Sequence, residues 1–177
     1  NELLIDSGLQ PQQRAWAMAV QASGRHLLGV INDILDFSKI ESGQLELEAI
    51  DFDLGDVVDE ALAMFAHPAE DKDLELAAQF VPHDAPLALR GDPLRLRQVL
   101  ANLIGNAIKF TGDGEVVVRV VLEQRSERES SIRICVQDTG IGISADAQAR
   151  IFEHFSQANG STTREFGGTG LGLAICK

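Results

Sequence analysis

The stretch DTGIGI at residues 138–143 directly follows a strand-like run, IRICV at residues 132–136, in which apolar residues alternate. An acidic residue at a strand end, followed by two glycines, suits a small flat ligand, because Asp138 can accept a hydrogen bond from an exocyclic amine. Gly140 and Gly142 allow backbone conformations and a close ligand approach that a side chain would block. The same pattern also makes ordinary turns, so a plain turn is the alternative interpretation.

A helical segment upstream, QVLANLIGNAIKF at residues 98–110, carries polar side chains at helical spacing. Asn102 and Asn106 are four residues apart, and Lys109 follows on nearly the same face. An asparagine oxygen is a hard, neutral ligand that suits magnesium, which keeps waters and bridges phosphates. Lys109 supplies a point charge for a phosphate. An exposed polar stripe is the alternative, but the interleaved apolar residues predict that the helix is seated on a core.

A glycine-rich run downstream, GGTGLGL at residues 167–173, lies at the start of a predicted helix. Free backbone amides and the positive end of the helix favour a phosphate there. The run lacks the Gly-Lys-Ser/Thr ending of a Walker P-loop, and it does not follow a strand as a Rossmann fingerprint must. The candidate ligand-binding residues of this run are Gly168, Thr169, Gly170, Leu171 and Gly172.

In this order, the three stretches resemble the ATP-binding domain of sensor histidine kinases, a member of the Bergerat-fold superfamily shared with gyrase B and MutL. The resemblance covers nearly the whole chain. It implies ATP and Mg2+ as cofactors, with the magnesium ion on Asn106 and with Asn102 and Lys109 lining the phosphate side. The glycine run would close over the triphosphate as the end of the ATP lid. Phe152 and Phe155 would form the phenylalanine box, although their spacing alone favours ordinary core residues.

The pattern along the chain predicts an α+β fold, a two-layer α/β sandwich with helices on one face of a largely antiparallel sheet. Residues 1–43 are expected to be part of a dimerisation helical hairpin, and residues 44–177 an ATP-binding catalytic domain whose C-terminal end is missing. The expected helices are the end of one at 1–8, then 11–41 ending at Gly43, 54–70 capped by Asp53, 93–110 capped by Asp92, and one from Ser144 through Ile151. The expected strands are 45–50, 74–80, 87–90, 115–122 and 132–137, with a hairpin loop at 123–131 and a glycine-rich loop at 156–168.

Acidic side chains outnumber basic ones, with 27 Asp and Glu against 15 Lys and Arg, a net charge of −12. This balance argues against a nucleic-acid partner, and a phosphate ligand would need local help from Lys109, Arg164, backbone amides or a metal. Cys135 and Cys176 lie in apolar segments without metal-like spacing, and they are expected to be buried reduced thiols. No apolar run approaches the length of a membrane span, so this stretch of chain is expected to be soluble.

A histidine kinase transfers the γ-phosphoryl group of ATP to a histidine on the first helix of its dimerisation bundle. This chain contains His26, His67, His83 and His154. None of them matches the family's acceptor pattern; His26 aligns with the second bundle helix and is expected to be a surface residue. By the resemblance, the acceptor lies upstream of Asn1 and the last helix and closing strands lie beyond Lys177. We therefore name no catalytic residue and expect an internal part of a longer protein.

The resemblance implies that the intact kinase phosphorylates its own histidine and passes the group to an aspartate of a response regulator or receiver domain. It also implies a homodimer through the dimerisation helices, and a cytoplasmic domain whose parent protein can be anchored in the inner membrane. Residues 36–43, DFSKIESG, resemble hybrid kinases that carry receiver domains.

Two other functions remain open from the sequence. A Bergerat-fold ATPase that drives a conformational clamp carries a glutamate one turn before the magnesium asparagine, to activate water. Here that position is Asn102, a poor base, which favours transfer over hydrolysis. A nucleotide-binding sensor module without catalysis is the other alternative.

Overall fold

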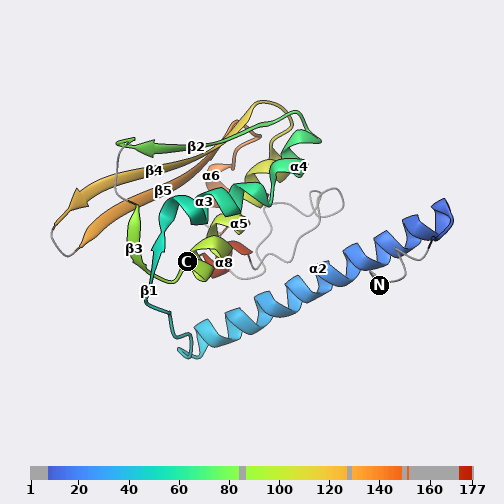
Figure 1. Cartoon of the computed structure of the whole chain (residues 1–177), viewed down its shortest axis with the longest axis horizontal. Helices are drawn as coiled ribbons and strands as arrows, with labels where there is room; N and C mark the ends of the chain where they lie inside the picture. Colours follow the sequence, from blue (N-terminus) through green and yellow to red (C-terminus); the bar gives the residue numbers. More distant parts are fainter. Residues whose placement is uncertain (1–7, 84–86, 127–128, 149–150, 152–171, 177) are drawn as a thin grey trace. The chain divides into compact units, whose positions relative to one another are not determined.

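The computed structural model describes residues 8–83, 87–126, 129–148, 151 and 172–176 (Figure 1). The chain divides into two compact units, Asn1–Leu45 and Glu46–Lys177. Within the described ranges, no helix combines the length and the apolar character that crossing a membrane requires. The expected helix end at residues 1–8 and the expected loop at 156–168 lie outside the described residues, apart from Gly8.

The first unit is built on a long helix, α2 (Pro11–Glu41), with the predicted bounds. Gly43 follows the helix with φ +65°, a left-handed conformation that glycine adopts without strain. Its N–H donates to the Ile40 carbonyl at 3.0 Å, and the N–H of Gln44 donates to the Lys39 carbonyl at 2.9 Å. These two bonds form a Schellman motif, which confirms the predicted helix end.

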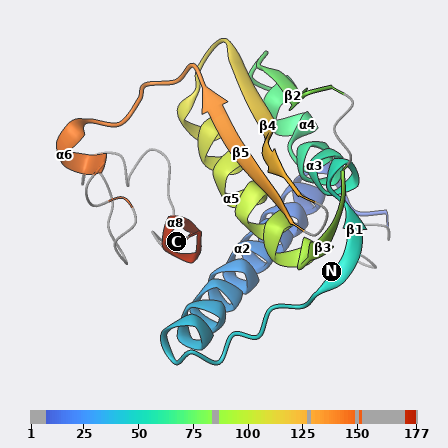
Figure 2. The ribbon, with the colours of Figure 1, turned by 90° about the vertical axis from the view of Figure 1, so that its left-hand side faces the viewer.

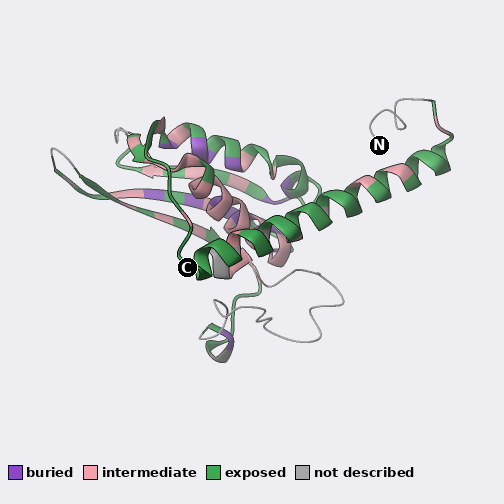
Figure 3. Cartoon of the chain, turned by 90° about the horizontal axis from the view of Figure 1, so that it is seen from below, coloured by how far each residue is buried: buried purple, intermediate pink, exposed green. Residues whose placement is uncertain are grey.

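Most residues of α2 are exposed to solvent (Figure 3), and large apolar residues are among them. The predicted apolar face consists of Trp16, Val20, Leu27, Leu28, Ile31, Ile34 and Leu35, and each of them is between 44% and 63% exposed. An amphipathic helix is stable in water mainly through the packing of such a face. The first unit therefore presents an apolar stripe along α2.

The second unit contains the α+β fold that the sequence predicts. Its helices are α3 (Leu54–Ala63), α4 (Ala66–Glu70), α5 (Pro93–Phe110), α6 (Ala145–Gln148) and α8 (Gly172–Ile175). Its strands are β1 (Ile50–Asp53), β2 (Glu75–Val81), β3 (Ala88–Gly91), β4 (Glu115–Arg125) and β5 (Ser130–Asp138). One sheet has the order β2-β4-β5, and a second consists of β1 and β3. Strands β4–β5 and β1–β3 pair antiparallel, whereas β2 and β4 are parallel, so the larger sheet is mixed rather than largely antiparallel.

Helices α3 and α5 cover one face of the three-stranded sheet (Figure 2). The core lies between these two layers and contains residues that are at most 1% exposed. They include Leu54 and Val58 of α3, Ile104 of α5, and Val116 and Val118 of β4. Burying a side chain of this size stabilises the fold by about 1.5–3 kcal/mol. This core fixes α5 against β4 and β5, which positions the residues of the candidate site.

The prediction of a single helix over residues 54–70 is wrong, because the structure contains two helices. Helix α3 ends at Ala63 and α4 begins at Ala66, with Phe65 between them at φ −113° and ψ 3°. Pro68 explains the break: proline has no N–H to donate to the carbonyl four residues back, that of Met64, and its ring would clash with it. The predicted cap is confirmed, since the Asp53 carboxylate accepts a hydrogen bond from the Gly55 N–H at 2.7 Å.

The first strand begins later than the expected range of 45–50, because β1 starts at Ile50. Its partner β3 ends at Gly91, which pairs with Ile50. Beyond that position the Asp92 side chain replaces the strand partner, and its Oδ2 accepts a hydrogen bond from the Glu48 N–H at 3.1 Å. The backbone before Ile50 is therefore held by a side chain rather than by backbone hydrogen bonds to a neighbouring strand.

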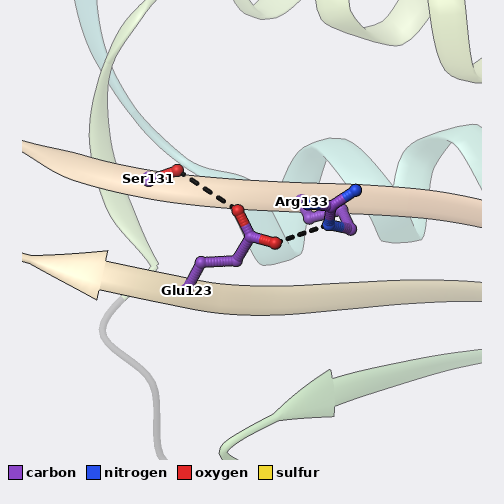
Figure 4. Close-up of polar contacts among 3 residues, drawn as sticks. All are labelled: Glu123, Ser131 and Arg133. Carbon is purple, nitrogen blue, oxygen red and sulfur yellow. Dashed lines mark hydrogen bonds and ion pairs between the residues drawn. The ribbon is translucent and has the colours of Figure 1, made fainter.

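The hairpin of β4 and β5 extends through most of the polar run expected to be a loop at residues 123–131. The register shifts between Leu122 and Gln124, which makes Glu123 the residue of a β-bulge. The Glu123 carboxylate accepts hydrogen bonds from the Arg133 guanidinium and the Ser131 hydroxyl on the opposite strand (Figure 4). The ion pair also raises the pKa of Arg133. Polar side chains thus pair across the two strands, and the polar character of this run alone does not distinguish such a hairpin from a loop.

The expectation that both cysteines are buried is wrong. Cys135 is exposed, and Cys176 is half-buried. Cys135 lies between Ile134 and Val136, which pack against the core. Because successive side chains of a strand point to opposite faces, Cys135 faces away from the core. Helix α6 begins directly after Ser144, as expected, and is described to Gln148; the Ile151 N–H donates to the Ala147 carbonyl at 3.0 Å.

Candidate functional site

Helix α5 begins as the sequence predicts and carries three of the candidate residues. The Asp92 carboxylate accepts a hydrogen bond from the Arg95 N–H at 2.9 Å, and Pro93 occupies the first turn. That bond is the main reason why the pKa of Asp92 is lowered. The cap fixes where the helix begins, and therefore which residues face the core further along.

Asn102 lies beside the first residue of α8. Its amide nitrogen donates to the Gly172 carbonyl at 3.3 Å and lies 4.0 Å from the Cys176 sulfur. The structure thus brings these two predicted site residues, Asn102 and Gly172, together from distant parts of the domain sequence. Burial raises the pKa of the Cys176 thiol, while the contact with Asn102 lowers it by a smaller amount. Asn106 lies one turn further along α5 and is half-buried.

Lys109 lies in the last turn of α5. Its ammonium group is 4.9 Å from the centroid of the Phe110 ring, a distance at which cation–π attraction operates. Partial burial lowers the pKa of Lys109 below that of a free lysine. The structure therefore holds this cation in a partly desolvated position, where its attraction for a phosphate is stronger than in bulk water.

The Asp138 loop is joined directly to the end of α5. The Gly140 N–H donates to Oδ1 of Asp138 at 2.9 Å, and the Ile141 N–H donates to the Phe110 carbonyl at 3.3 Å. A Cβ atom on Gly140 would lie 2.5 Å from that carbonyl oxygen and 2.9 Å from the Thr111 hydroxyl. Glycine is therefore required at this position by the close approach of two backbone segments.

Thr139 ties the same loop to the start of β4. Its hydroxyl accepts a hydrogen bond from the Glu115 N–H at 3.0 Å and donates to the Asp113 carbonyl at 3.2 Å. Gly142 has φ +68°, and a Cβ atom placed on it would meet no other atom within 4 Å, so this glycine is favoured by its backbone conformation alone. Asp138 itself is exposed, at the end of β5.

The sequence reasoning missed three residues that hold the site together. Thr111 is fully buried, and its hydroxyl donates to the Ala107 carbonyl at 2.7 Å. Lys72 donates to carbonyls at the end of α5, and Thr139 makes the contacts given above. A threonine directly after a helix is a detectable signal for Thr111. No local pattern connects Lys72 with a helix 36 residues away.

Several predicted residues lie outside the described residues: Gly168, Thr169, Gly170, Leu171, Phe152, Phe155, His154, Arg164 and the side chain of His26. Within the described part of the chain, no cluster of three or more His, Cys, Asp or Glu side chains could hold a metal ion.

Comparisons with known proteins relate this chain to ATPase domains and to sensor histidine kinases. Residues 91–177 match the family described as Histidine kinase-, DNA gyrase B-, and HSP90-like ATPase. The chain is 50% identical over 175 residues to the Sensor protein GacS of Pseudomonas syringae pv. syringae, covering 99% of this chain and 19% of that protein. It is 44% identical over 173 residues to the Signal transduction histidine-protein kinase BarA of Escherichia coli K12, covering 98% of this chain and 19% of that protein.

Among solved structures, full-length ShkA in complex with AMPPNP is similar to this chain, with a TM-score of 0.75 and 36% identity. The match covers 98% of this chain and 34% of ShkA. The fold and the matched residues therefore define an ATPase domain of the histidine kinase, gyrase B and HSP90 type. Over nearly its whole length the chain is similar to a segment of these sensor histidine kinases, and it spans about a fifth of the length of the curated relatives.

Proposed function

We propose that this chain is the ATP-binding catalytic region of a protein-histidine kinase. In the intact protein it transfers the γ-phosphoryl group of ATP to a histidine on the dimerisation helices, and the group then passes to an aspartate of a response regulator or receiver domain. The main support for the proposal is the joint between α5 and the Asp138 loop, which is the hydrogen bond from the Ile141 N–H to the Phe110 carbonyl. This bond connects the segment that carries the Asp138 carboxylate to the segment that carries the Lys109 ammonium group.

The chemistry of the candidate residues fits ATP and magnesium. The exposed Asp138 carboxylate can accept a hydrogen bond from the exocyclic amine of adenine. Asn106 offers a neutral oxygen for Mg2+, and Lys109 offers a partly desolvated cation for a phosphate. When bound, the magnesium ion would neutralise charge on the transferred group, and the protein would contribute mainly position and electrostatic stabilisation.

The asparagine at position 102 supports transfer rather than hydrolysis. An ATPase of this fold would need a carboxylate at position 102 to activate water, and an asparagine amide is a poor base. Here the Asn102 amide donates to a backbone carbonyl at 3.3 Å. This contact connects α5 to α8. The ATPase clamp and the non-catalytic sensor thus have less support than the kinase.

We also propose that the apolar stripe of α2 binds helices of a second copy of the chain in the intact kinase. The support is the exposure of large apolar side chains such as Trp16 and Leu27, at 62% and 59%. The catalytic domain would lie in the cytoplasm, with the parent protein anchored in the inner membrane. Sedimentation of the wild type and of a Leu27→Glu variant tests the second copy: a dimer that the variant loses supports it, and a wild-type monomer at high concentration contradicts it.

Calorimetric titration with ATP and Mg2+ tests the proposed nucleotide site. We expect the wild type to bind and Asp138→Asn to bind at least about tenfold more weakly, because a hydrogen bond to a charged group contributes about 1.5–3 kcal/mol. Asp59→Asn is the matched control, since Asp59 is an exposed aspartate on α3. Asn106→Asp should change the magnesium dependence of binding while leaving adenosine affinity unchanged.

Two results would contradict the proposal. One is a folded wild type that does not bind ATP, and the other is equal affinity in Asp138→Asn and Asp59→Asn. If binding is found, the labelled γ-phosphoryl group is followed to a separately supplied acceptor helix. Release of inorganic phosphate without labelling of that helix would favour the ATPase alternative.

A further inference from the structure

A single lysine outside the three sequence motifs contacts the C-terminal end of α5. The Lys72 ammonium group donates to three backbone carbonyls, at 2.7 Å to Ile108, 3.2 Å to Lys109 and 3.2 Å to Thr111. An ammonium group has three hydrogens to donate. All three contacts are made to one short segment of chain.

A cation stabilises an α-helix most when it binds the carbonyl groups at the C-terminal end of the helix. The last carbonyls of an α-helix have no partner within the helix, and the helix dipole makes this end negative. Ile108 and Thr111 are buried, so water has limited access to this segment. An unpaired buried carbonyl costs free energy, and Lys72 supplies the missing donor.

The turn between α4 and β2 delivers Lys72 to this position. Asp73 has φ +54°, in the left-handed region, where aspartate and asparagine are enriched among residues other than glycine. The Leu74 N–H donates to the Ala69 carbonyl at 3.0 Å, and the Lys72 N–H donates to the same carbonyl at 3.0 Å. The backbone on both sides of Asp73 is therefore fixed, and the lysine leaves the turn in a defined place.

The segment that Lys72 contacts is the one on which the Asp138 loop rests. The Phe110 carbonyl, which lies between the Lys109 and Thr111 carbonyls in the sequence, accepts the Ile141 N–H at 3.3 Å. The approach of Gly140 to the same oxygen leaves no room for a side chain. A displacement of this turn would accordingly move the Asp138 loop and the Lys109 side chain together.

We propose that Lys72 is a positioning residue of the nucleotide site: by binding the Ile108, Lys109 and Thr111 carbonyls it fixes the end of α5, and through it the Asp138 loop. The inference rests on the proposed ATP site for its function. The observed contacts of the Lys72 ammonium group are with backbone carbonyls. It acts through the backbone of the turn that connects the adenine side to the phosphate side.

The test compares Lys72→Met and Lys72→Arg with the wild-type chain. Lys39→Met is the charge-matched control, because Lys39 lies in the last turn of α2 in the other unit. Hydrogen exchange of the Ile141 amide, measured without nucleotide, reports directly on the bond to Phe110. Calorimetry with ATP and Mg2+ reports on the site. Circular dichroism establishes that each variant is folded.

We expect Lys72→Met to exchange the Ile141 amide faster and to lose ATP affinity, each by about tenfold or more, the effect of removing charge-assisted hydrogen bonds. Lys72→Arg should recover both to within about threefold, since a guanidinium can also donate to several carbonyls. Lys39→Met should match the wild type in both measurements.

An unchanged Ile141 exchange rate in folded Lys72→Met would overturn the inference, and so would equal effects in Lys72→Met and Lys39→Met. Should Lys72→Met fail to fold, Lys72→Gln keeps an amide donor and is judged by the same exchange measurement. Failure of the wild type to bind ATP refutes the proposed function whatever Lys72 does. Normal ATP binding by a folded Lys72→Met refutes the role of Lys72 alone.

Discussion

Substitution of Gly140 by alanine tests the joint between α5 and the Asp138 loop most directly. The new Cβ would lie 2.5 Å from the Phe110 carbonyl oxygen, whereas real Cβ atoms essentially never approach closer than 3.0 Å. The Phe110 carbonyl belongs to the backbone and cannot turn away as a side chain could. The loop must therefore move by at least about 0.5 Å, which lengthens the 3.3 Å bond from Ile141 beyond the range of a hydrogen bond.

The cost follows from the two effects together. Losing one backbone hydrogen bond costs about 1 kcal/mol, and overpacking costs about 1–3 kcal/mol. We expect Gly140→Ala to lower the free energy of unfolding by roughly 2–4 kcal/mol. Because the Asp138 carboxylate moves with the loop, the affinity for ATP should fall by about tenfold or more. Urea denaturation and calorimetric titration with ATP and Mg2+ measure the two quantities.

Two nearby glycines serve as controls. Gly142 has φ +68° and open space around it, so Gly142→Ala should cost only the left-handed conformation, about 1–2 kcal/mol. Gly112 has open space and no such conformation, and Gly112→Ala should change stability by no more than about 0.5 kcal/mol. If Gly140→Ala is as stable as Gly112→Ala and binds ATP like the wild type, the proposed role of this joint is wrong.

Two further predictions concern α5. Asp92→Ala should destabilise the domain by about 1–2 kcal/mol through loss of the helix cap, and Asp92→Asn should destabilise it by less. Because the pKa of Asp92 is lowered in the fold, the stabilisation by its charge is present above the unfolded pKa and is lost as the pH falls through the folded pKa. Urea denaturation of Asp92→Asn should therefore show a weaker acid dependence than that of the wild type. The pKa of Lys109 is lowered by burial, so the unfolded chain binds more protons and stability should rise with pH between the folded pKa and about 10.5. Lys109→Met should remove that alkaline rise, and an unchanged rise in the variant would contradict the assignment.

The features that the sequence predicted well depend on local interactions. The long helix Pro11–Glu41, the Asp53 and Asp92 caps and the alternating strand before Asp138 are each determined by residues within a few positions of one another. Capping, proline at a first helical turn and period-two alternation act over this range. Pro68, which divides the helix expected at 54–70, is also a local signal, and the apolar periodicity around it concealed the break.

The features that were missed depend on contacts between distant residues. The late start of β1 is determined by where β3 ends and by the Asp92 side chain, which binds the Glu48 N–H. The extended hairpin is held by cross-strand contacts of Glu123. The exposure of Cys135 is in principle readable from the alternation of the strand, but the apolar residues around this cysteine favoured the buried interpretation.

The candidate site shows the same division. The residue types of Asp138, Asn106 and Lys109 could be read from the sequence because each belongs to a short motif. Their connection could not, because it is made by backbone groups, the Phe110 carbonyl and the Ile141 N–H, which every sequence possesses. A motif therefore indicates which chemistry is present, while the packing of α5 against β5 determines how that chemistry is arranged.

The central strand β4 pairs antiparallel with β5 and parallel with β2, and this difference affects the order in which the strands join during folding. Its antiparallel partner β5 begins only five residues after β4 ends, whereas its parallel pairing with β2 joins residues far apart in the chain, as in Glu75 and Glu115. Hairpins close within about 1–10 μs, and long-range pairing must first overcome the entropy of closing the larger loop. We therefore expect β5 to join β4 before β2 does, so that substitutions in the hairpin slow refolding and substitutions in β2 mainly accelerate unfolding.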